Sequence, residues 1–297
     1  MKIIDVSKRT AGNRITCLSY GATRAGKTRC AATFPRPLFL SDATETGWTT
    51  IANMDRNAFW EPDRVPQVWA IENAADMMTA IRDAEQIIKA RPGEIQTIVV
   101  DSLTFYADLF FSAMDSSAQS SGKTPDNRRL FQILAGHLKE LRIRVHMLPV
   151  NVVWLALEKA ADADNPIGGP MLPGQNAAKF AAGCDYIFYH RSFQNRPIDP
   201  VQWEVRTRRF GQYPAGGRDE GLLPDPLGYY GQIEGKDDPV FITDCTYRTI
   251  AEALGILPIV QAETASVGGS NGKEEVLIAP VIPVTKKGST GRATPSR

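Results

Sequence analysis

Gly21-Ala-Thr-Arg-Ala-Gly-Lys-Thr28 is the stretch of sequence that decides how the rest of the chain is arranged. Its spacing fits the pattern G-x-x-x-x-G-K-[ST], which is typical of a loop that holds phosphate groups. Residues 15–20 are rich in apolar and β-branched side chains and predict a buried strand. Residues 27–34 predict a helix, which Pro35 would end. A strand, a glycine-containing turn and a helix in this order direct backbone N–H groups and the positive helix end at an anion.

Each part of this loop has an expected role. The two glycines let the backbone turn, Lys27 would reach the β and γ phosphates of a nucleotide, and the Thr28 hydroxyl would hold Mg²⁺. A glycine turn that carries a lysine by chance is the alternative, and the flanking strand and helix argue against it. We therefore predict ATP and Mg²⁺ as cofactors. The residues expected to bind ATP are Gly21, Ala22, Thr23, Arg24, Ala25, Gly26, Lys27, Thr28 and Arg29.

Asp101 is the second part of the expected site, because it directly follows the apolar run 95–100. Such a nearly continuous apolar run is typical of a parallel strand that is buried on both faces. An acid at the end of such a strand is what a Walker B segment needs, since its carboxylate would contact the water shell of Mg²⁺ or the Thr28 hydroxyl. We predict that Thr28 and Asp101 form the metal site.

Hydrolysis also needs a group that orients or deprotonates the attacking water. Glu45 and Asp42 follow the short apolar strand predicted at 37–40. The carboxyl ends of such strands are where ligands bind in open α/β sheets. We predict Glu45 as the catalytic base and keep Asp42 as the alternative. Both acids could instead cap a helix or turn that starts near Trp48.

Two further residues are candidates for sensing the nucleotide. Glu158 follows the predicted strand 151–157 and is expected to contact the γ phosphate or its attacking water; an exposed pair with Lys159 is the alternative. Arg218 lies in a loop flanked by glycines, from which an arginine can reach a phosphate across a subunit boundary. The residues that we expect to take part in catalysis are Glu45, Lys27, Glu158 and Arg218.

The overall charge gives no sign of a polyanionic partner. The chain has 297 residues, 34 basic and 33 acidic, and a formal net charge of +1, so any nucleic acid must meet a local patch. Basic residues gather in predicted loops, and aromatic residues are interleaved with the later ones, which suits phosphate contacts and base stacking. Ordinary solvated loops are the alternative. The basic residues are Lys123, Arg128, Arg129, Arg191, Arg196, Arg206, Arg208 and Arg209, and the aromatic ones are Phe193, Trp203, Phe210 and Tyr213.

Patterning outside the site predicts one α/β domain over residues 1–260 and a disordered tail over 261–297, where Gly, Ser, Thr, Lys and Pro show no period. The further elements that we expect are a helix capped by Asn73, a helix at 103–114, an exposed loop at 115–127, a helix with apolar residues from Leu130 to Val145, a long loop at 160–179, strands at 185–189 and 202–207, a loop at 208–228 and a helix at 247–254.

The cysteines and the apolar runs indicate the cellular compartment of the protein. Four cysteines lie scattered without C-x-x-C spacing, which suits reduced thiols in a cytoplasm. The three histidines also stand alone, without the spacing of a zinc site. No signal peptide is evident, and no apolar run approaches the roughly 20 residues that would span a bilayer. We expect a cytoplasmic protein that does not enter a membrane.

Taken in order, these segments resemble the RecA-like ATPases encoded by phages, in particular the Sak-type group of recombination and annealing proteins. The resemblance runs from residue 15 to residue 254. It rests on the stretches 21–28, 31–35, 37–45, 98–104, 151–159, 172–174 and 221–225.

The resemblance implies a fold and a function. The fold would be a RecA-like P-loop core with a mostly parallel central sheet flanked by helices. The alternating strands expected at 185–189 and 202–207 would add an antiparallel extension. The protein would hydrolyse ATP while acting on single-stranded DNA, alongside a single-strand-binding protein, as a homo-oligomer or filament. Lys27 and Thr28 would bind phosphate and Mg²⁺, and Asp101 would be the Walker B acid. Glu45 would match the acid after the second core strand, and Glu158 the polar sensor after the fourth.

Two departures and two other functions stay open. In the family the acid after the second strand usually comes sooner, so Asp42 could hold the role of Glu45. The family also tends to show a lysine near residues 215–218, where only Arg218 carries over. The other functions are a nucleotide-gated assembly protein with negligible hydrolysis and a P-loop kinase of a small molecule.

Overall fold

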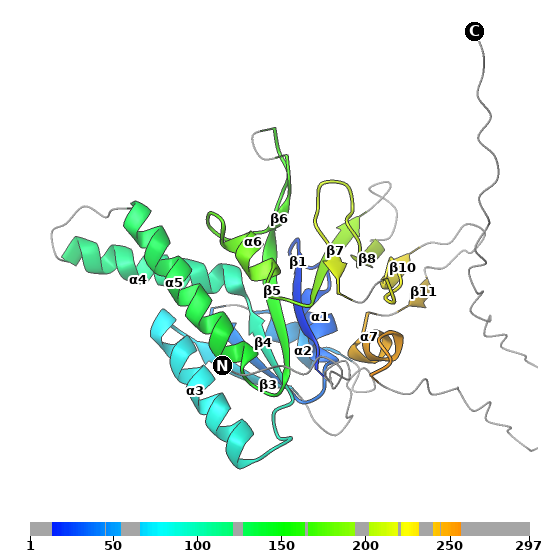
Figure 1. Cartoon of the computed structure of the whole chain (residues 1–297), viewed down its shortest axis with the longest axis horizontal. Helices are drawn as coiled ribbons and strands as arrows, with labels where there is room; N and C mark the ends of the chain where they lie inside the picture. The colour runs from blue at the N-terminus through cyan, green and yellow to red at the C-terminus, as the bar shows by residue number, and fades with distance from the viewer. Residues whose placement is uncertain are drawn as a thin grey trace, which may run out of the picture. The chain divides into compact units, whose positions relative to one another are not determined.

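The fold is a single mixed sheet with helices against both of its faces (Figure 1). The structure is a computed structural model, and it describes residues 14–44, 46–54, 66–120, 127–163, 166–193, 202–218, 221–231, 240–243 and 245–256. Glu45, Lys123, Arg196 and the expected tail at 261–297 lie outside the described residues, so the predictions made for them stay predictions.

Parallel strands form the centre of the sheet, in the spatial order β7-β1-β5-β4-β2-β3. All residues of β1, β2 and β4 are buried, as expected for strands covered on both faces, whereas the edge strand β3 is largely exposed. The strand that carries the glycine loop, β1, is separated from the strand that ends in Asp101, β4, by β5 alone. The strands are β1 (Thr16–Gly21), β2 (Pro37–Asp42), β3 (Gln67–Ile71), β4 (Thr97–Asp101), β5 (Asn151–Lys159) and β7 (Tyr186–Phe193).

An antiparallel extension continues the sheet beyond β7, as the sequence predicts. β8 (Gln202–Arg206) pairs with β7, β10 (Gly228–Gly231) with β8, and β11 (Val240–Thr243) with β10. Two short strands lie off this path: β6 (Gly169–Pro170) pairs with β5, and β9 (Gly216–Gly217) pairs with β7.

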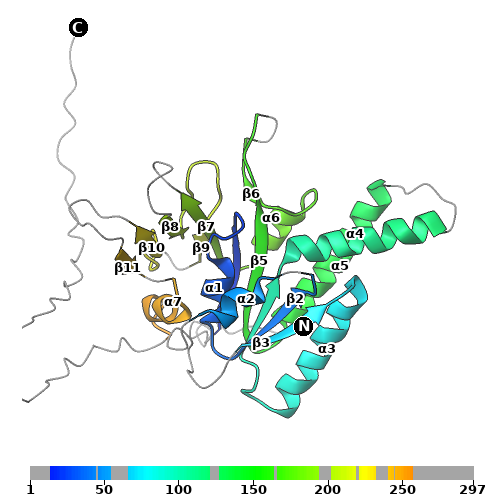
Figure 2. The same ribbon diagram turned by 180° about the vertical axis from the view of Figure 1, so that it is seen from behind.

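The helices divide between the two faces and create two hydrophobic cores. On the face seen in Figure 1, α3, α5 and α6 pack with α4 around Trp154, Leu134 and Phe180. On the other face, seen in Figure 2, α1, α2 and α7 pack around Phe34 and Ile250. The helices are α1 (Lys27–Ala32), α2 (Trp48–Ala52), α3 (Ala74–Ala90), α4 (Leu103–Ser120), α5 (Asn127–His146), α6 (Asn176–Ala181) and α7 (Tyr247–Ala253).

Local sequence determines several helix ends. The Asn73 side chain accepts hydrogen bonds from the backbone N–H groups of Ala75 and Asp76, and the Asp76 carboxylate accepts one from the backbone N–H of Asn73. The predicted cap of α3 is therefore confirmed. At the end of α1, the Thr33 hydroxyl donates to the Cys30 carbonyl oxygen. This bond helps to end α1 at Ala32, two residues before the predicted end.

Three predicted loops were partly wrong. α4 continues to Ser120, because the stretch after Met114 contains no glycine or proline until Gly122 and its polar side chains can stay in solvent on a helix. The expected loop at 160–179 includes β6 and the start of α6, which the burial of Leu172 and Phe180 anchors to the core. The expected loop at 208–228 includes β9, whose two glycines pair with Tyr186 and Ile187 of β7.

Candidate functional site

The loop between β1 and α1 lies at the carboxyl end of the central parallel strands, where the sequence predicts it. Gly26, at the N-cap of α1, has a φ of 87°, a conformation that glycine adopts without steric cost. Gly21 packs directly against β7, and a Cβ atom on it would lie 2.0 Å from the His190 carbonyl oxygen. The two glycines thus serve different needs, a left-handed turn and a close approach of two strands.

Lys27 is folded back into this loop. Its Nζ donates hydrogen bonds to the carbonyl oxygens of Gly21, at 2.9 Å, and Ala22, at 2.7 Å, and only 8% of the residue is exposed. A buried ammonium group needs acceptors such as these. A phosphate that entered the loop would offer stronger, charged acceptors to the same three N–H bonds.

Thr28, on α1, is brought to Asp101, on β4, although β1 and β4 are not neighbours in the sheet. The Thr28 hydroxyl donates to Asp101 Oδ2 over 3.0 Å. Asp101 is 94% buried, which raises the pKa of its carboxyl group, whereas the bond from Thr28 and the charge of Lys27 act in the opposite direction. A hydroxyl and a carboxylate oxygen are ligands that suit Mg²⁺, so these two residues fit the expected metal site.

The end of β2 lies beside the end of β4, as the role of a catalytic acid requires. Ser41 pairs with Asp101 in the register of the two strands, and Asp42 follows directly. Asp42 Oδ1 accepts hydrogen bonds from the backbone N–H and the hydroxyl of Thr44, so this oxygen is used within its own turn. Glu45, beyond this turn, is the expected base that lies outside the described residues.

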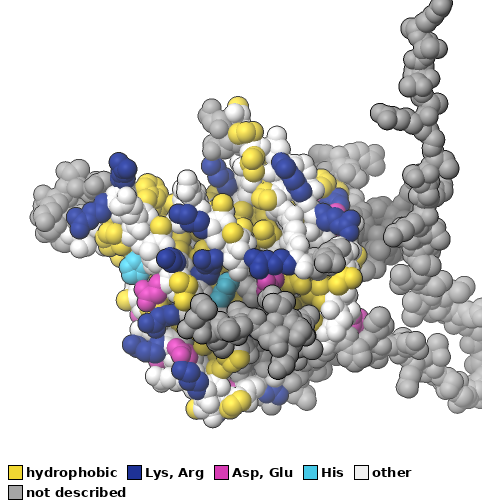
Figure 3. Space-filling model, viewed as in Figure 1, with side chains coloured by type: hydrophobic (Ala, Val, Ile, Leu, Met, Phe, Trp, Pro, Cys, Tyr) yellow, Lys and Arg dark blue, Asp and Glu magenta, His cyan; other side chains and the backbone are white. Residues whose placement is uncertain are grey.

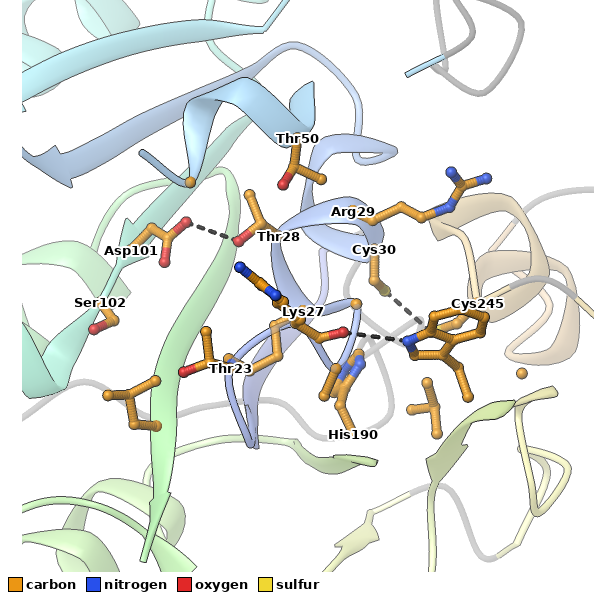
Figure 4. A pocket seen from close by; sticks show the side chains of 18 of the residues that line it. Thr23, Lys27, Thr28, Arg29, Cys30, Thr50, Asp101, Ser102, His190 and Cys245 are labelled. Carbon is orange, nitrogen blue, oxygen red and sulfur yellow. Dashed lines mark hydrogen bonds between the residues drawn. The ribbon is translucent and has the colours of Figure 1, made fainter. Parts of the chain in front are cut away.

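A cavity of about 700 Å³ opens over the loop (Figure 4). Pockets for small molecules and cofactors are typically ~300–1,000 Å³, so a nucleoside triphosphate is a suitable size for it. Asp101 and Ser102 lie on one side of Lys27, and Arg29 and Cys245 lie on the other. The cavity therefore extends from the expected metal site across the loop to the antiparallel part of the sheet.

Neither Glu158 nor Arg218 lines the cavity over the loop. Glu158, on β5, accepts a hydrogen bond of 3.4 Å from the Tyr189 hydroxyl, and the cavity is lined by its neighbour Leu157 instead. Arg218 lies at the amino end of β7, where it donates to the Ala182 carbonyl oxygen over 3.0 Å. It is thus at the opposite end of the parallel strands from the loop and could reach a phosphate only in another copy of the chain.

Two residues beside the loop were not predicted for this site. His190 is 1% exposed, and burial, followed by the charge of Lys27, lowers its pKa to about 3, so the ring is neutral. Trp203, on β8, donates from Nε1 to the Arg24 carbonyl oxygen at 3.2 Å. The sequence marks Trp203 as an aromatic residue among basic ones, but contains no local sign that β8 reaches the loop.

The other flank of α1 contacts the segment before α7. The Sγ atoms of Cys30 and Cys245, both free thiols and both buried, are 3.0 Å apart. The backbone N–H of Tyr247 donates to the Thr33 hydroxyl at 2.8 Å. These contacts seat α7 on the helix that follows the loop.

Comparison with known proteins assigns the chain to a family. A family model described as an AAA domain matches residues 13–218, more than half of the chain. Among curated proteins, no relative matches. Among solved structures, the chain is similar to the KaiC-like protein PH0186 from the hyperthermophilic archaeon Pyrococcus horikoshii OT3, with 15% identity and a TM-score of 0.43 over 76% of this chain and 88% of that chain. Within the described residues, no helix has the length and apolar character to cross a membrane.

Proposed function

This chain belongs to the AAA domain family, and from that premise we propose that it is a Mg²⁺-dependent ATPase that acts on single-stranded DNA. The observation that carries the proposal is the hydrogen bond between Thr28 and Asp101 beside a buried Lys27. These three side chains offer a cation for the β and γ phosphates and two oxygens for Mg²⁺, in the cavity over a phosphate-binding loop.

Within this proposal the protein acts mainly by positioning and by charge, as P-loop enzymes do. The backbone N–H groups of the loop and Lys27 would hold the triphosphate, and Mg²⁺ at Thr28 and Asp101 would neutralise the charge that develops on it. Glu45 would orient the attacking water, with Asp42 as the alternative, and Glu158 would respond to the γ phosphate. Arg218 would act on the nucleotide of a neighbouring copy in a homo-oligomer or filament.

Support for a DNA-binding surface comes from exposed basic residues near exposed apolar ones. Arg208 and Arg209 are exposed after β8, and Leu222 in the following loop is 63% exposed. By contrast, Arg191 and Arg206 form ion pairs with the buried Glu204, at 3.0 and 3.1 Å, and lie over the Phe210 ring. Their charges are therefore partly satisfied inside the protein, and we assign the DNA contact to Arg208 and Arg209.

A second basic area lies on the helices. Arg128 and Arg129 are exposed at the start of α5, and basic side chains are spread over this face with hydrophobic ones between them (Figure 3). The order of motifs that resembles Sak-type phage proteins supports a role in recombination or annealing of single strands, with a single-strand-binding protein as partner.

The experiment that tests the proposal is phosphate release by the wild type and by Lys27→Ala, with and without single-stranded DNA. We expect turnover that DNA stimulates and that Lys27→Ala abolishes. Near-zero release under all conditions, with normal ATP binding, would favour a nucleotide-gated assembly protein instead. Phosphate transfer to a small molecule, without a response to DNA, would favour a kinase.

A matched pair of variants tests the DNA surface. Arg208→Ala with Arg209→Ala should weaken DNA binding at every sequence and lower the dependence of affinity on salt, because each phosphate contact releases counterions. Arg82→Ala, which removes an exposed charge from α3, serves as the control. Equal DNA affinity of the double variant and the control would refute this assignment.

A further inference from the structure

The cavity has a side that the expected chemistry does not use. We call the wall formed by Trp203, Val205, Gly228 and Cys245 the β8 side, and the wall formed by Asp101 and Ser102 the metal side. The loop lies between them. We propose that the β8 side binds the base of the nucleotide and that Trp203 stacks on this base. The inference rests on the proposed function, because it concerns the same nucleotide.

The direction of the nucleotide follows from the metal side. Mg²⁺ in P-loop enzymes contacts the β and γ phosphates, so a metal at Thr28 and Asp101 places the γ end of the triphosphate on that side. The loop and the start of α1 hold the middle of the phosphate chain. The nucleoside must then leave the loop on the opposite side, where Figure 4 shows Arg29 and Cys245.

Trp203 is positioned at the rim of the loop on that side. Side chains alternate along a strand, so Trp203 shares a face of β8 with Val205. Val205 packs in the same hydrophobic core as Cys30, on the face of the sheet that α1 covers. Trp203 lies closer than Val205 to the carboxyl edge of the parallel strands, because it pairs with Ser192, whereas Val205 pairs with His190. Its indole is half-buried and lines the cavity.

The surroundings of Trp203 suit a flat, largely apolar ring. Val205 is buried, and Gly228 lets β10 approach the segment before α7 so closely that a Cβ atom on it would lie 2.8 Å from Cys245 atoms. Glu204, which lies between Trp203 and Val205 on β8, points to the other face of the sheet by the same alternation and is engaged by Arg191 and Arg206. Aromatic stacking accepts every base, and a purine offers the larger area, so we assign this side to a purine nucleoside triphosphate.

The hydrogen bond from Trp203 to Arg24 offers a different explanation that must be separated from stacking. In that explanation the indole N–H only holds the loop in place, and the ring never meets a ligand. The two explanations differ in what they predict for a ligand without a base. Inorganic tripolyphosphate occupies the phosphate loop but has nothing to stack on Trp203.

The experiment measures the affinity of the full chain for MgATP and for magnesium tripolyphosphate, with Trp203→Ala, Trp203→Phe and Lys27→Ala. Loss of stacking in Trp203→Ala should weaken ATP binding roughly 5- to 150-fold and change tripolyphosphate binding less than about twofold. Trp203→Phe keeps a ring but lacks the N–H, so its ATP affinity should stay within about threefold of the wild type. Lys27→Ala should lose both ligands.

Three results would overturn the inference. Unchanged ATP affinity in Trp203→Ala would remove the base site but leave the proposed function intact. Equal weakening of ATP and tripolyphosphate in both Trp203 variants would show that the N–H bond to Arg24 is what matters. Failure of the wild type to bind either ligand would refute the proposed function itself, and the base site with it.

Tryptophan fluorescence gives a second readout that does not depend on small differences in folding. ATP should quench part of the emission of the wild type, tripolyphosphate should not, and the quenching should disappear in Trp203→Phe. The matched control is Trp69→Phe, which changes a partly buried tryptophan on β3, away from the cavity. This variant should retain the quenching by ATP. Quenching that survives in Trp203→Phe would contradict the stacking.

Discussion

The Thr28 hydroxyl donates a hydrogen bond to Asp101 over 3.0 Å, across the width of β5. This contact joins the two motifs that the sequence places 73 residues apart. It holds the two oxygens of the expected Mg²⁺ site 3.0 Å apart. Little reorganisation of the strands is then needed when the cation arrives.

Asp101→Asn should separate activity from stability. Loss of the carboxylate should lower Mg²⁺-dependent turnover about 100-fold or more, since a metal ion supplies several kcal/mol of charge stabilisation. Burial raises the pKa of Asp101, so its charged form is disfavoured in the folded protein, and the neutral amide should leave the chain at least as stable towards urea at pH 7. The companion variant Thr28→Val removes the other side-chain oxygen of the expected metal site. Unaltered turnover in Asp101→Asn would refute the metal site.

Glu45→Gln and Asp42→Asn should distinguish the two candidate bases. We expect Glu45→Gln to lower the turnover about 100-fold or more and to leave ATP binding within about threefold, because a general base acts on the water rather than on the nucleotide. Asp42→Asn should act chiefly on the turn, since Asp42 accepts bonds from Thr44. Single-turnover hydrolysis measures both. Turnover lost only in Asp42→Asn would move the role of the base to that residue.

Two histidines with lowered pKa values, the buried His190 and the half-buried His146, should make the protein sensitive to acid. The pKa of His190 is lowered to about 3 and that of His146 to about 4, in both cases mainly by burial. Below the unfolded value of about 6.5 the unfolded chain binds the protons, so the stability present at pH 7 is lost as the pH falls. For His190 the loss should approach about 1.4 kcal/mol per pH unit between pH 6 and pH 4.

Urea unfolding between pH 7 and pH 4 measures this loss. His190→Leu removes the largest contribution to this loss, so the free energy of unfolding should depend less steeply on pH. In His146→Leu the part due to His190 should remain, although the bond that His146 Nε2 accepts from Trp154 is lost. If the free energy of unfolding fell equally steeply with pH in the wild type and in His190→Leu, His190 would not titrate as described.

The two glycines of the loop should respond differently to alanine. Gly21→Ala places a Cβ atom against the His190 carbonyl oxygen and should cost about 3 kcal/mol or more, because neither strand can move away easily. Gly26→Ala meets no atom within 4 Å and suffers only from its φ of 87°, which costs about 1–2 kcal/mol. Urea unfolding of both variants without nucleotide checks the order. A larger loss for Gly26→Ala would contradict it.

Much of the fold and the centre of the site could be predicted, because their determinants are local. The glycine loop, the apolar run before Asp101 and the cap at Asn73 each depend on a few neighbouring residues. The contact of Trp203 with Arg24 joins residues 179 positions apart and depends on the pairing of β7 with β8, which no local pattern contains. The pairing of β9 with β7 places Arg218 at the amino end of β7, although its sequence neighbourhood suggests a phosphate contact.

The contact of the α7 region with α1 and Thr33 determines how far the protein can be shortened and still fold. The family match ends at residue 218, and a chain trimmed there would lack Cys245 and the Tyr247 N–H that contact Cys30 and Thr33. Trimming would leave Phe34 and its neighbours in water, just after the helix that carries Lys27 and Thr28. The smallest soluble fragment should therefore extend at least to residue 256.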